Sequence, residues 1–356
     1  MRFWHGMRVR DFVRLLKRNR FRVHPYRYGM VFTVSLSACC NSVLARLQQL
    51  LRGRAIDATE IVEPPIFIVG HWRSGTTLMH ELLSRDPRLA FPSTYECCAP
   101  HHFAISGRIL PKLLWFMAPK QRPMDNMAAG FSHPQEDEFA LCALGAPTPY
   151  LRIAFPNHPA VWMEMLDMRQ AAPDDVKAFE DALLWFVKAL TYCKQKRLIL
   201  KSPPHTGRVA MLSRLFPGAK FVHMVRDPCA LFPSTRRTWE ALDYTQGFQI
   251  PRSDYLDEFV FECLERMYTG FHEQRGALDE GSICDVRYED LARDPVGEVE
   301  TVYRKLNLGE FEAVRPALVQ YTKQQKDYRP NRHQLSAEKA ALIRDRWHGY
   351  CNQYGY

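Results

Sequence analysis

Short apolar runs recur along the chain, and each is followed by glycine-rich or polar residues. Four runs have the length and composition of buried strands: IFIV at the start of IFIVGHWRSGTT (66–77), RLILKSPPH (197–205), KFVHMV (220–225) and ICDVRYEDL (283–291). Helices are predicted after three of them: from Thr76 to about Ser84, near 208–215 and at about 296–306. Strands that alternate with helices form a mainly parallel sheet covered on both faces. The sequence therefore predicts an α/β fold of this kind.

The pattern before residue 64 is different. The Glu63-Pro64-Pro65 segment breaks regular structure, so we expect a helical extension over residues 1–63 and the main domain over 64–356. Residues 28–45 are uncharged, but their strongly apolar part is shorter than the ~20 residues needed to span a bilayer. Apolar residues recur there and just beyond at helical spacing: Phe32, Leu36, Cys40, Val43, Leu47 and Leu50. This stripe predicts an amphipathic helix that docks on the rest of the protein.

Positive charge is concentrated at the N-terminus. The formal net charge is +9, and residues 1–27 contain nine Lys and Arg but only Asp11 as an acid, a net +8. Such a segment attracts anionic surfaces, including a membrane leaflet. Apolar residues recur within it at helical spacing: Val9, Phe12, Val13 and Leu16. The pattern fits either an interfacial amphipathic helix or a basic helix packed on the domain.

The cysteine content and the charge outside the N-terminal segment limit the compartment, the metals and the partners that we expect. Ten cysteines without a CxxC pair do not resemble a disulfide framework in a chain of 356 residues, so a cytoplasmic protein is expected, with the basic arm able to attach it to the inner face of a membrane. Cys97, Cys98, His101 and His102 lack the usual spacing of zinc ligands, so no metal is expected. No basic surface interleaved with aromatic residues lies outside the arm, so no nucleic-acid partner is expected.

The loop after the first predicted strand has the spacing of a phosphate-binding loop but lacks its lysine. Gly70, four residues and then Gly75-Thr76-Thr77 reproduce GxxxxGK[ST], with Thr76 in place of Lys. In a nucleotide kinase that Lys reaches the β- and γ-phosphates and the next hydroxyl holds Mg²⁺. This loop offers backbone N–H groups, hydroxyls and the Arg73 guanidinium, which suit a 5′-phosphate without a metal. A nucleotide or small-molecule kinase is the less favoured alternative.

Other polar residues also follow predicted strand ends. Lys201, Arg226 and Tyr288 come after the second, third and fourth strands, as Arg73 does after the first. Ligands of parallel α/β sheets bind beyond the carboxyl ends of the strands. We therefore expect these side chains to converge on one crevice, with residues from about 90 to 195 forming helices and loops over it.

These motifs together resemble the signature of sulfotransferases that use 3′-phosphoadenosine 5′-phosphosulfate (PAPS). The resemblance spans roughly residues 64–350 and rests on RSGTT (73–77), Lys201, RDP (226–228) and Ser234. The stretch from Leu200 to Pro228 is similar to tyrosylprotein sulfotransferases. Four blocks resemble uncharacterised bacterial sulfotransferase-like proteins more closely: GHWRSGTT, RPMDN (122–126), HPQEDEFAL (133–141) and the terminal Tyr354-Gly355-Tyr356. The resemblance implies in-line transfer of a sulfuryl group from PAPS to a hydroxyl or amine, with no metal.

The resemblance also implies roles for individual residues. The nucleotide-binding set comprises Arg73, Ser74, Gly75, Thr76, Thr77, Arg226, Ser234 and Tyr288. The loop and the following helix N-terminus would bind the 5′-phosphate. Arg226 and Ser234 would bind the 3′-phosphate, and Tyr288 would lie near the adenine. Lys201 matches the catalytic Lys of the family, a cation aimed at the bridging oxygen of the leaving nucleotide.

The general base that accepts the acceptor's proton is left open among three residues. Glu96 lies near the position of a catalytic Glu in tyrosylprotein sulfotransferases, offset by about two residues. Glu136 belongs to a carboxylate cluster whose members can raise one another's pKa, although such a cluster also suits a helix start. His205 lies four residues beyond Lys201 and could equally be a helix cap or a core histidine.

The acceptor and a non-catalytic reading are also left open. A small molecule, a carbohydrate, a lipid or a peptide could each accept the group, and the basic N-terminus slightly favours an acceptor at a membrane. A non-catalytic, membrane-associated P-loop-like protein would explain the basic arm. It would not explain why Lys201, Arg226 and Ser234 occur together.

Overall fold

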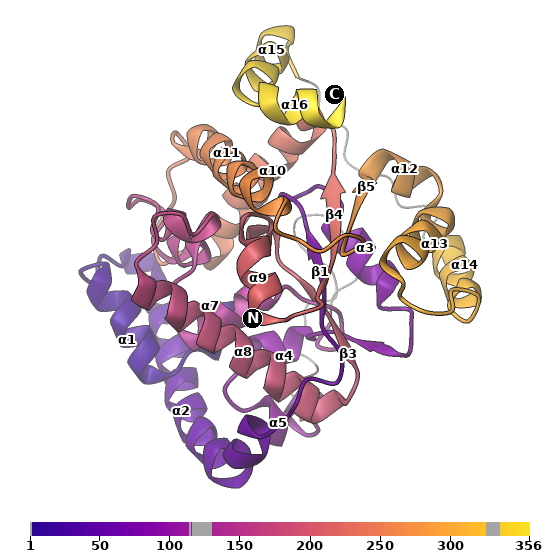
Figure 1. Cartoon of the computed structure of the whole chain (residues 1–356). Helices are drawn as coiled ribbons and strands as arrows, with labels where there is room; N and C mark the ends of the chain where they lie inside the picture. Colours follow the sequence, from indigo (N-terminus) through magenta and orange to yellow (C-terminus); the bar gives the residue numbers. More distant parts are fainter. Residues whose placement is uncertain (1, 114, 116–129, 325–334) are drawn as a thin grey trace.

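A five-stranded sheet forms the centre of the molecule (Figure 1). The computed structural model describes residues 2–113, 115, 130–324 and 335–356, so the RPMDN block lies outside the described residues. The strand order is β2-β3-β1-β4-β5 and every pairing is parallel. The strands are β1 (Ile66–Val69), β2 (Leu89–Ala90), β3 (Arg197–Lys201), β4 (Lys220–Val225) and β5 (Ile283–Arg287). The predicted α/β fold with a parallel sheet is confirmed, and β2 is a short strand that the apolar pattern did not reveal.

Side chains of the central strand alternate between two hydrophobic clusters. Ile66 and Ile68 of β1 join a cluster with α3 (Thr76–Leu83), α13 (Pro295–Leu306) and α14 (Arg315–Gln324). Phe67 and Val69 join the larger cluster on the other face. Both faces of the sheet are therefore covered, which explains why the strands read as continuous apolar runs.

The helices expected after the strands are present within about one residue of their predicted ends. α3 begins at Thr76, α9 spans Val209–Leu215 and α13 begins at Pro295, where the Asp294 side chain accepts a hydrogen bond from the backbone N–H of Gly297. The other helices of the main domain are α4 (Thr94–Cys98), α5 (Phe103–Ser106), α6 (Leu110–Leu113), α7 (Asp137–Leu144), α8 (Pro173–Lys194), α10 (Pro228–Gln246), α11 (Leu256–Arg275), α12 (Tyr288–Arg293), α15 (Ala337–Arg346) and α16 (His348–Tyr354). Short 3₁₀ segments are η4 (Pro149–Ala154), η5 (Met163–Leu166) and η6 (Pro203–Arg208).

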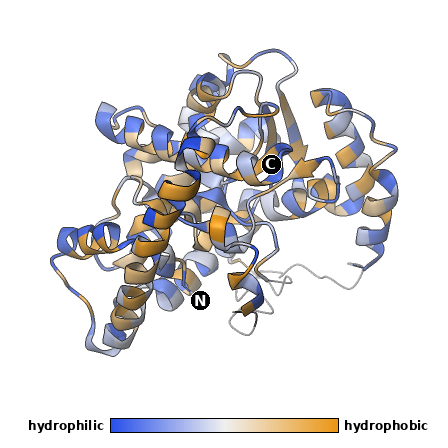
Figure 2. Cartoon of the chain, turned by 90° about the horizontal axis from the view of Figure 1, so that it is seen from below, coloured by the Kyte–Doolittle hydropathy of each residue, from blue (hydrophilic) through white to orange (hydrophobic). Residues whose placement is uncertain are grey.

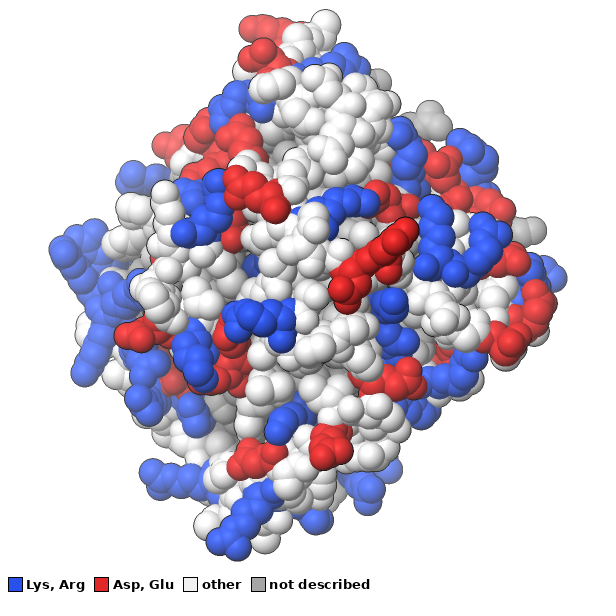
Figure 3. All heavy atoms as spheres, in the orientation of Figure 1, with Lys and Arg blue, Asp and Glu red and all other residues white. Residues whose placement is uncertain are grey.

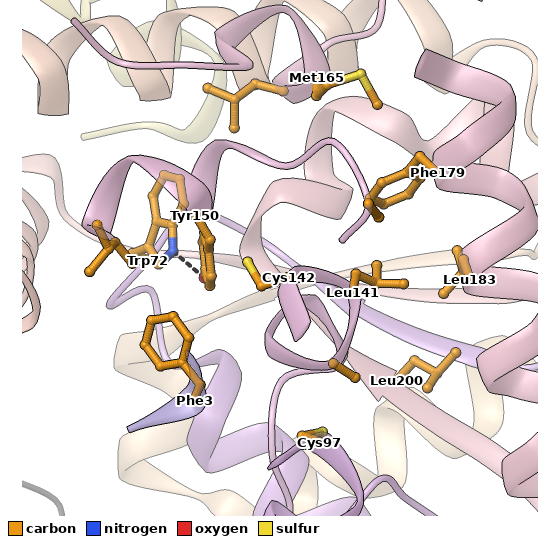
Figure 4. Packing of buried hydrophobic residues seen from close by; sticks show 14 of the residues in the cluster. Phe3, Trp72, Cys97, Leu141, Cys142, Tyr150, Met165, Phe179, Leu183 and Leu200 are labelled. Carbon is orange, nitrogen blue, oxygen red and sulfur yellow. Dashed lines mark hydrogen bonds between the residues drawn. The ribbon is translucent and has the colours of Figure 1, made fainter. Parts of the chain in front are cut away.

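The N-terminal segment packs on the main domain through its first elements. These are η1 (Phe3–Gly6), α1 (Val9–Arg18) and η2 (Pro25–Arg27). Phe3 belongs to the large cluster and lies in the packing around Trp72 and Tyr150 (Figure 4). Phe12 of α1 is 2% exposed. Of the two alternatives for this segment, the structure has the basic helix packed on the domain.

The next helix, α2 (Tyr28–Asp57), is confirmed as a helix, but its predicted orientation is wrong. The predicted docking stripe faces outward: Phe32, Leu36, Cys40, Val43, Leu47 and Leu50 are all exposed. The opposite face packs on the protein through residues that are small, aliphatic or amide-bearing: Met30, Val34, Ala38, Asn41, Gln48, Gly53 and Ile56. Asn41 donates hydrogen bonds to the carbonyls of His5 and Met7. These bonds, which periodicity cannot reveal, fix that face inward.

Candidate active site

The loop between β1 and α3 has the backbone of a phosphate-binding loop. Gly70, Arg73 and Gly75 all have positive φ, at +132°, +69° and +99°. A Cβ on Gly70 would lie 2.4 Å from the carbonyl oxygen of Met224, and one on Gly75 would lie 2.5 Å from the Tyr288 ring. Both positions therefore require glycine.

The N-terminus of α3 presents hydrogen-bond donors to this loop. Thr76 and Thr77 are the first two residues of the helix, and Gly75 before them has no side chain to cap it. The Ser74 hydroxyl is buried and has no hydrogen-bond partner within the described parts of the chain. Free N–H groups, the helix dipole and a buried unused hydroxyl together fit a phosphate oxygen.

Side chains from three further elements meet at Arg73. Its Nε donates to the Ser234 hydroxyl of α10 at 3.0 Å, and its carbonyl accepts from Arg226 Nη1 at 2.8 Å. The Arg226 guanidinium lies over the Tyr288 ring, 4.1 Å from the centroid. Four of the predicted nucleotide-binding residues are thus linked in a chain of contacts from Ser234 through Arg73 and Arg226 to Tyr288. Two guanidinium groups and a hydroxyl in one place can bind a second phosphate.

The C-terminal helix α16 holds Arg226 in place, which sequence reasoning missed. The Tyr350 hydroxyl accepts from the backbone N–H of Arg226 at 2.9 Å and donates to its carbonyl at 3.0 Å. Burial raises the pKa of Tyr350 well above its usual value, so the phenol stays protonated and keeps both bonds. No motif marked Tyr350, because its role depends on a contact across 124 positions of the chain.

Lys201 and Glu136 form the second part of the site. Lys201 is the last residue of β3 and lies opposite Ile68 of β1, so it reaches the same sheet edge as the phosphate loop. Its Nζ is 2.5 Å from Glu136 Oε1, and its side chain is 2% exposed. Glu136 is the residue directly before α7, and its side chain makes no capping hydrogen bond to that helix. A cation and a carboxylate thus lie together at the end of the central strands.

The three clustered carboxylates have different environments. Asp137 Oδ2 lies 2.7 Å from His205 Nε2, and Glu138 Oε2 lies 3.0 Å from Arg208 Nη1; both of these carboxylate side chains are fully buried. The Glu136 side chain is 10% exposed. Glu136 is therefore the least buried of the three carboxylates.

Trp72 and Tyr150 connect the two parts of the site. Trp72 Nε1 donates to the Tyr150 hydroxyl at 2.6 Å (Figure 4), and Tyr150 donates to Glu136 Oε2 at 2.6 Å. Burial and the neighbouring Glu136 carboxylate raise the pKa of Tyr150 well above its usual value, so the phenol remains a donor. Trp72 directly precedes Arg73, so this loop is linked to the Glu136 carboxylate through the Tyr150 hydroxyl. Tyr150 follows no strand and belongs to no motif, and for that reason sequence reasoning missed it.

The other two candidate bases have structural contacts. Glu96 accepts from the backbone N–H of Ser93 at 2.7 Å in a capping box of α4, and it pairs with Lys194 at 2.9 Å. His205 is fully buried, with its ring edge-on to Phe67 at 5.6 Å. That environment is typical of the core histidine that the sequence left as one alternative.

No group of three or more His, Cys, Asp or Glu within the described residues could hold a metal ion. His101 and His102, which lie near Cys97 and Cys98, instead bond to protein groups. His101 Nε2 lies 3.0 Å from the carbonyl oxygen of Ala143, and His102 Nε2 lies 3.1 Å from Asn41 Oδ1 on α2. These two histidines therefore help to attach α2 and α7 to the core.

Comparisons with known proteins show the family of the chain. The model of the sulfotransferase family matches residues 64–313. The omega-hydroxy-beta-dihydromenaquinone-9 sulfotransferases Stf3 of Mycobacterium bovis and Mycobacterium tuberculosis are each 42% identical over 353 residues, 99% of this chain and 91% of theirs. The solved sulfotransferase STF9 from Mycobacterium avium shares the fold, with a TM-score of 0.70 at 15% identity over 93% of this chain and 86% of that one. The chain therefore belongs to the sulfotransferase family and is a PAPS-dependent sulfotransferase.

Proposed function

We propose that this sulfotransferase acts on a hydroxyl group of a menaquinone-like lipid. The observation that carries the proposal is the 42% identity, along nearly the whole chain, to proteins named for a hydroxylated dihydromenaquinone. The matched length includes the N-terminal helices as well as the main domain. The acceptor would therefore be an apolar molecule with a terminal hydroxyl, rather than a carbohydrate or a peptide.

The phosphate groups of the donor would be held at two places. The loop from Ser74 to Thr77 and the N-terminus of α3 suit the 5′-phosphate, because the Ser74 hydroxyl is buried without a partner within the described residues. Arg226 and Ser234 suit the 3′-phosphate, since both contact Arg73 and the Arg226 guanidinium lies over the Tyr288 ring. Thr76 in place of the kinase Lys argues against transfer of a phosphoryl group from ATP with Mg²⁺.

Glu136 and Lys201 would carry the two charge changes of the reaction. Glu136 takes the proton of the acceptor hydroxyl as that oxygen bonds to sulfur. The bond between sulfur and the bridging oxygen breaks, and the electron pair stays on the departing bisphosphate. Lys201 stabilises that oxygen with its ammonium group. Within the described residues, Glu136 Oε1 accepts a hydrogen bond from Lys201 and Oε2 accepts one from Tyr150. Each carboxylate oxygen therefore has a second lone pair that could take the proton.

We assign the base role to Glu136 rather than to Glu96 or His205. Glu136 touches Lys201, and its side chain is partly exposed. Glu96 contacts Lys194 and its own helix, and His205 is fully buried against Asp137. A base has to reach the acceptor's proton within hydrogen-bond distance.

Two measurements test the function. Isothermal titration of the protein with 3′-phosphoadenosine 5′-phosphate, without metal, should show binding that ATP with Mg²⁺ does not match. Preference for ATP with Mg²⁺ would support the kinase alternative. Turnover of PAPS should then be faster with an omega-hydroxylated menaquinone than with the same menaquinone lacking the hydroxyl, or with glucose. Equal turnover with all three would contradict the lipid acceptor while leaving the donor site in place.

A further inference from the structure

The outward side of α2 carries a continuous apolar surface. We call it the α2 outer face and define it by Phe32, Leu36, Val43, Leu47 and Leu50, which are 42 to 84% exposed. Seen from below, α2 lies on the near side of the molecule, and hydrophobic residues run along its length (Figure 2). An apolar strip of this length on a soluble surface normally marks a contact with another molecule or with a membrane.

The charge around this face is predominantly positive. Residues 1–57, to the end of α2, contain twelve Lys and Arg and two acids, a net charge of +10 against +9 for the whole chain. Asp11 is buried and bonds to Arg8, and Asp57 is the last residue of α2. Arg46 and Arg54 are exposed on α2, and Arg10 and Arg14 are exposed on α1, whose outer side borders a shallow pocket. Blue side chains accordingly gather on the flank formed by α1 and α2 (Figure 3).

We propose that the α2 outer face binds the surface of an anionic lipid bilayer, with the helix lying in the plane of the interface. Apolar side chains enter the boundary between headgroups and acyl chains, and the arginines beside them meet anionic headgroups. Charge complementarity selects this occupant, since a row of apolar side chains flanked mainly by arginines suits anionic lipid better than a second basic copy of the chain.

The contacts of the opposite face show why α2 lies on the membrane rather than crossing it. By length and composition, Pro25–Asp57 is the one segment among the described residues that could span a bilayer, and 22% of its apolar window is buried in the protein. Asn41 donates to the carbonyls of His5 and Met7, and Gln48 accepts from the N–H of Ala104. A spanning helix would break these bonds and place both amides in hydrocarbon, which is costly.

The test measures binding of the full chain to vesicles by flotation. Vesicles contain either equal parts of phosphatidylcholine and phosphatidylglycerol or phosphatidylcholine alone. The Leu36→Gln/Leu50→Gln variant should bind the mixed vesicles about tenfold or more weakly than the wild type, because two leucines no longer leave water. Ile250→Gln/Leu342→Gln is the matched control, since both residues are exposed aliphatics outside this face. It should bind as the wild type does.

A second pair of substitutions separates charge from apolar contact. Arg46→Gln/Arg54→Gln should weaken binding to the mixed vesicles about fivefold for each charge removed, with little change on phosphatidylcholine alone. All the substituted side chains are exposed, and Gln has a helix propensity close to that of Leu and Arg, so unchanged thermal unfolding should accompany these effects.

Three results would overturn the proposal. They are no flotation of the wild type with mixed vesicles, equal flotation of the Leu36→Gln/Leu50→Gln variant, and a lipid-free dimer that this variant dissociates in the absence of vesicle binding. The last would assign the face to a second copy of the chain. Neither donor nor acceptor is present in the assay, so its result is independent of the proposed function.

Discussion

The carboxyl edge of the sheet and the N-terminal helix pair are both rich in arginine, but they differ in how their side chains are placed. At the sheet edge, Lys201 ends β3 opposite Ile68 of β1, and Arg73 lies in the loop that follows β1, so the strand register places both residues at the same edge. In α1 and α2, periodicity groups apolar residues on one side without fixing what that side contacts. Phe12 is buried, whereas Phe32 is 71% exposed. Positions at the ends of parallel strands therefore predict which residues share a site. The apolar face of a helix does not by itself predict what that face contacts.

The largest effect should come from removing the proposed base at the sheet edge. Glu136→Gln keeps the size of the side chain and an oxygen for Lys201, but it cannot take up the acceptor's proton. Turnover should fall about 10²- to 10⁴-fold with nucleotide affinity retained, as measured by PAPS-dependent product formation and by titration. Glu96→Gln is the control and should keep turnover near that of the wild type. Loss of turnover in Glu96→Gln alone would move the base role there.

The next effect should distinguish the two N-terminal helices. Phe12→Ala removes a buried ring and should lower the free energy of unfolding by about 3 to 5 kcal/mol. Phe32→Ala removes an exposed ring and should change it by less than about 0.5 kcal/mol. Denaturant unfolding of both variants measures the difference. Similar losses in the two would mean that α2 docks through its apolar stripe after all.

A smaller effect on nucleotide binding is expected when one proposed phosphate-binding side chain is removed. Arg226→Ala should weaken binding of 3′-phosphoadenosine 5′-phosphate by about 10- to 100-fold, the scale of a lost charge-assisted hydrogen bond. Arg344→Ala, an exposed arginine on α15, is the control and should bind normally. Titration calorimetry measures both. Normal affinity in Arg226→Ala would remove Arg226 from the 3′-phosphate site.

The smallest effect concerns acid stability in both regions. Burial lowers the pKa of His71, in the phosphate loop, to about 3, and that of His102, which faces α2, to about 4, from 6.5. Both histidines are neutral in the folded protein near pH 6, whereas in the unfolded chain they take up protons as the pH falls below 6.5. Each histidine should therefore cost about 1 kcal/mol of stability as the pH falls by one unit below 6.5. In denaturant unfolding of His71→Asn and His102→Asn, the free energy of unfolding should fall less steeply with decreasing pH than in the wild type. An unchanged dependence on pH would contradict this prediction.

Much of the fold and the candidate site could be predicted from local sequence. Apolar runs located four of the five strands, because a strand covered on both faces must be apolar throughout. Gly70 and Gly75 marked the loop, because only glycine adopts its backbone there without a clash. Strand β2, two residues long, has no such signal.

Other parts of the site depend on contacts between distant segments. Tyr350 bonds to Arg226, and Tyr150 joins Trp72 to Glu136. Neither tyrosine lies in a recognisable motif. Among the candidate bases, the sequence ranked Glu96 first, Glu136 second and His205 third. Burial and ion pairing separate them, and both are properties of the packed chain.

The sequence alone thus located four of the five strands, identified the loop in which Thr76 replaces the kinase Lys, and indicated the family. It also determined that Phe32, Leu36 and Leu50 share one face of a helix, since the α-helical repeat follows from backbone geometry. Only the tertiary structure decided which face of α2 turns outward. The physical reason is that Asn41 and Gln48 hydrogen-bond to backbone groups of η1, its C-terminal flank and α5, so that face stays inward and the apolar stripe meets the surroundings.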